Sequence, residues 1–297
     1  MRVAPVVLAL MVLQSPPAQP QDPLPALPPE VRTAYETRLA EARRAYERTP
    51  DNADSVIWLG RRTAYLGRYR EAIGIFTEGI RKHPDDARMY RHRGHRYLTI
   101  RDFGRAITDL ERGVSLVRGK PDEVEPDGIP NARGIPTSSL HSNLRYHLGL
   151  AYYLEGRFDR AAEIYAQDVA AAQAGGNPDM LVASSHWLYM ALRRSGKAEA
   201  AAAVLQPVTR DLPVIENGSY HRLLLLYKGA IPADSLLPDL DRRALSTVED
   251  VTLGYGLGNW HLYNGRTEVA MAIFRKIVAS PQWAAFGYIA AEAELKR

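Results

Sequence analysis

The chain has 297 residues, 46% of them hydrophobic and 24% charged, so it can bury a large core and is not disordered as a whole. It contains no cysteine, which excludes disulfides, thiolate metal ligands and a nucleophilic thiol. Its formal net charge of +4 is mild for this length, so we interpret it as a solubilising surface charge and expect no nucleic-acid partner.

Residues 1–20 have the form of a secretory signal peptide. Met1-Arg2 is a short basic start, 3–13 is an almost purely apolar run, and a polar, proline-rich stretch follows. Eleven apolar residues are too few to span a bilayer, and no later apolar segment is long enough either. We therefore expect a periplasmic or secreted protein without a membrane span. Residues 21–28 continue as an extended, proline-rich tether.

A helix is predicted over residues 29–50, because Pro28-Pro29 suits a helix start and Pro50 follows its end. Beyond it, small and aromatic residues return with a period of thirty-four residues, which indicates a solenoid of stacked helical hairpins. Small side chains are needed where two helices approach closely. Four sets of residues carry this register: Gly60, Tyr69, Ala72 and Phe76; Gly94, Phe103, Ala106 and Leu110; Gly149, Phe158, Ala161 and Tyr165; Gly258, Ala270 and Phe274.

The first copy of the repeat, residues 53–86, has the most specific pattern. Its small, aromatic and terminating positions are Trp58-Leu59-Gly60, Gly67, Tyr69, Ala72, Phe76 and Pro84. In these positions the chain resembles the tetratricopeptide repeat family, over about residues 53–284 and with a specificity that falls toward the C-terminus. The resemblance implies an all-α fold, a right-handed superhelical solenoid of antiparallel helix pairs, in which the first helix of each pair lines a concave groove.

The spacing of the later copies indicates where the array is interrupted. Gly94 to Gly149 is one period plus 21 residues, so an insertion is predicted at 117–141. A degenerate repeat is predicted at 215–245, with helices at Tyr220–Tyr227 and Asp234–Leu240. The remaining organisation is two repeats at 53–118, two at 142–214, one at 251–284 and a capping helix at 285–297.

The resemblance implies a non-enzymatic protein–protein interaction scaffold of the cell envelope, without a cofactor, which binds a peptide or protein segment in its concave groove. Aromatic and arginine side chains most often anchor such interfaces. The family's groove positions, carried onto this chain, give these candidate partner-binding residues: Arg61, Tyr65, Arg88, Arg91, His95, Asn143, Tyr146, Tyr153, His186 and Asn259.

Six arginines lie within eighteen residues: Arg88, Arg91, Arg93, Arg96, Arg101 and Arg105. On a helix, positions 88, 91 and 95 share a face that suits a carboxylate, and pairing with acids of neighbouring helices is the alternative. Some family members clamp a terminal carboxylate with lysine and asparagine. The corresponding residues here do not match that pattern: Ile57, Arg61, His92, Asn143 and His147.

Two other classes of function stay open. One is the binding of a small anionic or glycan ligand under the 117–141 loop, because long ordered loops in compact arrays are often functional; a passive excursion of the loop is the alternative. The other is an enzyme, which several histidines and a carboxylate in one pocket would favour. His92 and His95 are three residues apart but lack further ligands, so no metal site is predicted.

Overall fold

The structure, a computed structural model, describes residues 22–126, 128–240 and 242–297. The expected signal peptide, residues 1–20, lies outside the described residues. Within them the chain is all-α, with thirteen α-helices, one 3₁₀ turn and one isolated β-bridge between Val124 and Ser139. The predicted all-α solenoid is confirmed. None of the helices described is both long enough and apolar enough to cross a membrane.

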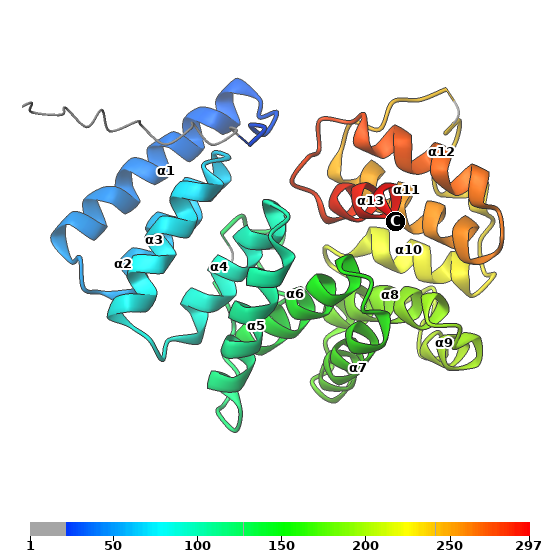
Figure 1. The fold of residues 1–297 in the computed structure, drawn as a ribbon, viewed down its shortest axis with the longest axis horizontal. Helices are drawn as coiled ribbons and strands as arrows, with labels where there is room; N and C mark the ends of the chain where they lie inside the picture. The colour runs from blue at the N-terminus through cyan, green and yellow to red at the C-terminus, as the bar shows by residue number, and fades with distance from the viewer. Residues whose placement is uncertain (1–21, 127, 241) are drawn as a thin grey trace, which may run out of the picture.

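The helices follow one another as antiparallel pairs that pack side by side along a curved array (Figure 1). Their bounds are α1 Pro29–Arg48, α2 Ala53–Tyr65, α3 Tyr69–Lys82, α4 Ala87–Thr99, α5 Phe103–Val117, α6 Leu140–Leu154, α7 Phe158–Ala174, α8 Pro178–Arg194, α9 Ala198–Val204, α10 Gly218–Tyr227, the 3₁₀ turn Ala233–Ser235, α11 Val248–Tyr263, α12 Thr267–Val278 and α13 Phe286–Lys296.

Helix starts and turns follow local side-chain chemistry. Asn52, Asp86 and Asn177 each accept a hydrogen bond from a backbone N–H in the first turn of α2, α4 and α8. The turn between α2 and α3 is made by Gly67 in the left-handed region, with φ +80°. The turn between α4 and α5 instead has Arg101 at φ 65°, a conformation that costs a non-glycine residue about 1 kcal/mol.

The thirty-four-residue register marks where the two helices of a pair touch. At Gly60 an added Cβ would lie 2.4 Å from the Phe76 ring, closer than real Cβ atoms approach. The same contact recurs at other pairs: Gly94 with Leu110 at 2.7 Å, Gly149 with Tyr165 at 2.7 Å, and Gly258 with Phe274 at 2.6 Å. The expectation that small residues permit close helix approach is therefore confirmed.

The regular pairing is interrupted at two places. The segment between α5 and α6, residues 118–139, is called the insertion, and its described residues, 118–126 and 128–139, form no helix. After α10, the helix predicted at Asp234–Leu240 is absent, and only the 3₁₀ turn is formed. That prediction is wrong because Pro238 has no N–H to donate and Asp239 adopts φ 54°, which cannot continue a right-handed helix.

The array curves until its C-terminal segment reaches its first half (Figure 1). Helix α13 packs on α11 and α12 and also contacts α6. Across the opening, the Arg101 guanidinium donates to Glu292 at 2.8 Å and to the Trp283 carbonyl at 2.8 Å, and it lies 3.7 Å from the Trp283 ring centroid. The chain's own C-terminal segment therefore covers part of the inner face of the array.

Candidate functional site

Three of the candidate partner-binding residues are buried inside the protein. Tyr153, His186 and Asn259 are at most 1% exposed. The Asn259 amide donates to the Tyr153 hydroxyl at 2.6 Å, and the Tyr255 hydroxyl donates to the same oxygen at 2.9 Å. His186 stacks on Tyr220 and Tyr227 of α10. The expectation that these side chains face a partner is corrected, because helices of the chain itself bury them.

Beside Tyr153 and Asn259 lies a hydrogen-bonded network of charged groups, which we call the Glu294 cluster. The buried Glu294 carboxylate accepts from Arg194 at 2.6 Å and from Arg297 at 2.7 Å. Arg297 also donates to the Tyr153 carbonyl at 2.9 Å, at the end of α6. These bonds attach α13 to α6 and α8, so this part of the predicted groove holds the fold together.

Three further candidates have structural partners. Arg88 bonds to Asp54 at 2.7 Å and to Asp86 at 2.6 Å. Asn143 is buried and donates to Glu125 at 2.9 Å. The Tyr146 hydroxyl lies 2.9 Å from the Tyr220 hydroxyl and accepts from Trp187 at 2.8 Å. Burial raises the pKa of Tyr146 well above its usual range, so its hydroxyl stays protonated.

The other four candidates, Arg61, Tyr65, Arg91 and His95, line one cavity of about 120 Å³ between α2 and α4. Ala64, Phe76, His92 and Arg96 complete its walls. We call this cavity the arginine pocket. Arg96 was not among the site residues predicted from the sequence. Its spacing could have indicated it, because residues 91 and 95, and likewise 92 and 96, are four apart and form two neighbouring rows of side chains on one side of α4.

The insertion forms part of the surroundings of this pocket. Arg62 donates to the Gly128 carbonyl at 2.8 Å, and a Cβ at Gly128 would overlap the Tyr65 hydroxyl at 1.6 Å. Further along, Asn131 donates to Glu216 at 3.0 Å. These bonds hold the insertion against α2 and against the segment before α10.

Charge in the arginine pocket is unevenly balanced. The buried carboxylate of Glu125, from the insertion, lies 3.0 Å from Arg91 Nε and 3.4 Å from His92 Nε2. Arg96 has no carboxylate within ion-pair distance among the described residues, whereas Arg93 pairs with Asp109 at 2.7 Å. Burial lowers the pKa of the Arg96 guanidinium to about 10, so it remains charged at neutral pH.

Three histidines stand beside these arginines. Burial, followed by the nearby arginines, holds the pKa of His92, His95 and His147 well below its usual range, so all three are neutral near pH 7. The ring centroids of His95 and His147 are 4.4 Å apart. Histidines and Glu125 thus gather at one pocket, the arrangement that would favour an enzyme. Among the described residues, however, no serine, threonine or lysine lines the pocket to act as a nucleophile.

No group of three or more histidine, aspartate or glutamate side chains in the described part of the chain is placed to hold a metal ion. The histidines near the arginine pocket have other neighbours. The Nδ1 atom of His147 lies 2.6 Å from the Asn143 carbonyl oxygen, and Nδ1 of His92 lies 2.9 Å from Arg91 Nη1. The guanidinium can only donate, so His92 accepts at Nδ1 and carries its proton at Nε2, toward Glu125.

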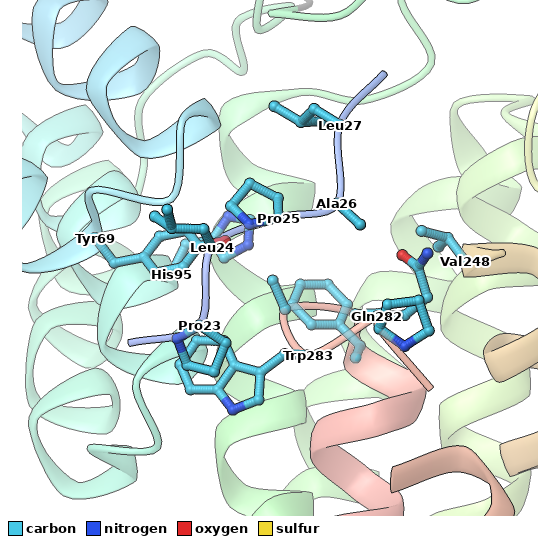
Figure 2. A pocket seen from close by; sticks show the side chains of 14 residues that line it. Pro23, Leu24, Pro25, Ala26, Leu27, Tyr69, His95, Val248, Gln282 and Trp283 are labelled. Atoms are coloured by element: carbon cyan, nitrogen blue, oxygen red, sulfur yellow. The ribbon is translucent and has the colours of Figure 1, made fainter. Parts of the chain in front are cut away.

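A second cavity of about 390 Å³ adjoins the first, and Figure 2 shows the side chains that line it. We call it the apolar channel. The chain's own residues 23–27 form part of its wall, together with Tyr69, His95, Val248 and residues 281–286. Tyr69 stacks on Trp283 at 5.9 Å between ring centroids. His95 lines both cavities, so they share a wall.

The fold is a curved array of helical hairpins, and two cavities of a size suited to ligands lie on its inner face. In sequence, residues 59–122 and 132–178 match the family model described as "Tetratricopeptide repeat". A human protein named "Tetratricopeptide repeat protein 13" is 38% identical over 56 residues. That match spans 19% of this chain and only 6% of the human protein.

Solved structures with similar arrays include YrrB, described as a TPR protein with an unusual peptide-binding site. It has 14% sequence identity and a TM-score of 0.45, over 86% of this chain and 97% of that one. Another is a putative kinesin light chain of Podosopora anserina with nearly identical TPR-like repeats, with 15% identity and a TM-score of 0.46, over 84% of this chain and 98% of that one. These similarities are weak, and no residue role is transferred from them.

Proposed function

We propose that the protein is a non-catalytic interaction scaffold of the cell envelope, and that it binds an extended apolar peptide segment of a partner protein in the apolar channel. The repeat match supports the scaffold role, because helical repeat arrays display extended binding faces. The envelope location rests on the signal-peptide pattern of residues 1–20.

The observation that carries the proposal is the proline-rich segment that forms one wall of the channel. Residues 23–27, Pro-Leu-Pro-Ala-Leu, form no helix and lie against Tyr69, Trp283 and Phe286. Proline-rich chains are extended before they bind and lose little conformational entropy, and aromatic walls are their usual binding surface. A partner segment of the same character would fit where residues 23–27 lie.

The binding test uses a chain that begins at residue 29, checked for helix content by circular dichroism, and a fluorescent peptide with the sequence of residues 22–28. We expect saturable binding by anisotropy, and weaker binding by a chain that begins at residue 22, whose own segment competes. Absence of binding to the folded, shortened chain contradicts the proposal.

A matched pair of surface substitutions separates the channel from the rest of the protein. Val248 is 58% exposed and lines the channel, whereas Val269 is 45% exposed and lies outside it on α12. Val248→Asp should weaken peptide binding at least about tenfold, because it puts a charge beside an apolar ligand. Val269→Asp should leave it unchanged.

Location is tested separately, by expressing the whole chain and measuring the mass of the protein recovered from each cell fraction. We expect a periplasmic or secreted product that lacks about the first twenty residues. A cytoplasmic product that keeps Met1 or Arg2 would remove the envelope part of the proposal and leave the channel untouched.

A further inference from the structure

The arginine pocket holds more positive charge than the acids of the described chain neutralise. Arg61, Arg91 and Arg96 line one cavity, and Glu125 is the one described carboxylate within ion-pair distance of any of them. The other arginines between positions 88 and 105 each pair with an acid: Arg88 with Asp54 and Asp86, Arg93 with Asp109, Arg101 with Glu292, Arg105 with Asp102.

Among residues 22–126 and 128–240, the remaining neighbours do not supply the missing negative charge. Glu125 is shared, since its second oxygen faces His92 and Asn143 donates to it at 2.9 Å. His92 and His95 are neutral near pH 7 and add positive charge if they take up protons. Unpaired charge that is shielded from water is costly. Arg61 and Arg96 have no described carboxylate within ion-pair distance, and their place beside Arg91 around one cavity favours a ligand of opposite sign.

The cavity has the size and the donors for a small oxyanion. Its volume of about 120 Å³ admits a carboxylate, phosphate or sulfate group but not a length of peptide chain. Guanidinium groups present planar, bidentate donors that match such groups, and the Tyr65 hydroxyl is also in the wall. Gly128 closes over that hydroxyl, so the insertion limits access to the pocket.

The geometry points to an oxyanion-binding site in which Arg61, Arg91 and Arg96 hold a carboxylate or phosphate group beneath the insertion. The group belongs either to a free small anion or to an acidic side chain or terminus of a peptide in the apolar channel, because His95 borders both cavities. The residues differ from the lysine and asparagine of the family's carboxylate clamp.

The test follows the melting temperature of the protein while inorganic phosphate replaces chloride at constant ionic strength. We expect a saturable rise, since a ligand that binds only the folded state stabilises it. Arg61→Gln and Arg96→Gln should each weaken the apparent phosphate affinity at least about tenfold. The control is Arg105→Gln, whose side chain is 71% exposed and outside the pocket, and its response should equal that of the parent protein.

A second readout separates ligand binding from a structural role of Arg96. In chloride alone, Arg96→Gln should melt no lower than the parent protein, because it removes like-charge repulsion. The inference is overturned if Arg96→Gln melts lower and keeps the phosphate response, or if phosphate and acidic peptides both fail to give a saturable rise in the parent protein. It is also overturned if Arg61→Gln and Arg96→Gln both respond to phosphate like the parent protein.

Two arms identify the source of the oxyanion, and either positive result supports the site. Saturation by phosphate alone assigns a free anion. Saturation only by an acidic peptide, lost when its carboxylates are amidated, assigns a group carried by a peptide. The Val248→Asp variant keeps the phosphate response even if the apolar channel binds no peptide, so failure of the proposed function and failure of this site are distinguishable.

Discussion

Two groups of arginines on the inner face of the array differ in how their charge is balanced. In the Glu294 cluster, two guanidinium groups bond to one buried carboxylate, and the Tyr255 hydroxyl adds a third contact at 3.3 Å. In the arginine pocket, three guanidinium groups line one cavity, and among the described carboxylates only Glu125 lies within ion-pair distance of any of them, at 3.0 Å from Arg91. A complete network attaches one helix to another, whereas an incomplete one beside a cavity keeps capacity for a ligand.

The largest effect should come from breaking the complete cluster. Glu294→Gln leaves Arg194 and Arg297 without their buried acid, so the free energy of unfolding should fall by about 3–5 kcal/mol in denaturant titrations. Glu268→Gln, at an exposed position of α12, should change it by less than about 0.5 kcal/mol. If the two variants unfold alike, the Glu294 cluster is not what attaches α13.

Acidification should have the next largest effect. Burial lowers the pKa of His186 to about 3, and His92, His95 and His147 are lowered well below their usual range. These histidines therefore bind protons near pH 6.5 in the unfolded chain but not in the folded chain, so the free energy of unfolding falls as the pH drops below that value. Each histidine contributes up to about 1.4 kcal/mol per pH unit, and for the four together we expect a loss of about 3 kcal/mol between pH 7 and pH 6.

This pH dependence also compares the two regions. His186 stacks on Tyr220 and Tyr227 in the second half of the chain, away from the arginine pocket. Phosphate in the pocket should favour protonation of His95 and so reduce the dependence of stability on pH. His186→Gln should reduce this dependence in the absence of phosphate as well. Calorimetric melts at several pH values measure both, and a flat profile in the parent protein contradicts the assignment.

The smallest effect concerns Arg101, which joins the two regions through Glu292 and Trp283. Its positive φ favours glycine, while its side chain makes the contacts. Both Arg101→Ala and Arg101→Gly remove the side-chain contacts. Alanine keeps the unfavourable positive φ angle, whereas glycine adopts it without strain. The alanine variant should be less stable than the glycine variant by about 1 kcal/mol in the same titrations. Equal stability would show that the backbone stores no strain there.

The sequence predicts local packing well because the contacts are close in the chain. Gly60 meets Phe76, and Gly149 meets Tyr165, within one helical pair, so period and residue size are sufficient to place them. The helix expected at Asp234–Leu240 fails for an equally local reason, the backbone at Pro238 and Asp239. Such errors could be reduced by closer reading of turn chemistry.

The site was only half predictable, because it depends on contacts between distant segments. Arg297 bonds to the Tyr153 carbonyl, and this return of the chain buries positions that an open array would expose. Some arginines also pair with acids that are distant in the sequence, as Arg101 does with Glu292. Nothing in the spacing of Arg91 and Arg96 tells that only the first would meet an acid.

Residues 23–27 remain joined to α1 while they form one wall of the apolar channel. A short tether gives such a segment an effective concentration in the millimolar range. The concentration at which a competing ligand displaces it therefore depends on the length of the tether as well as on the contacts that the ligand makes. Its apparent affinity is reduced by the fraction of molecules in which the channel is open. Partners that are tethered, clustered or multivalent therefore gain most, and a lengthened or cut tether changes selectivity without altering any channel residue.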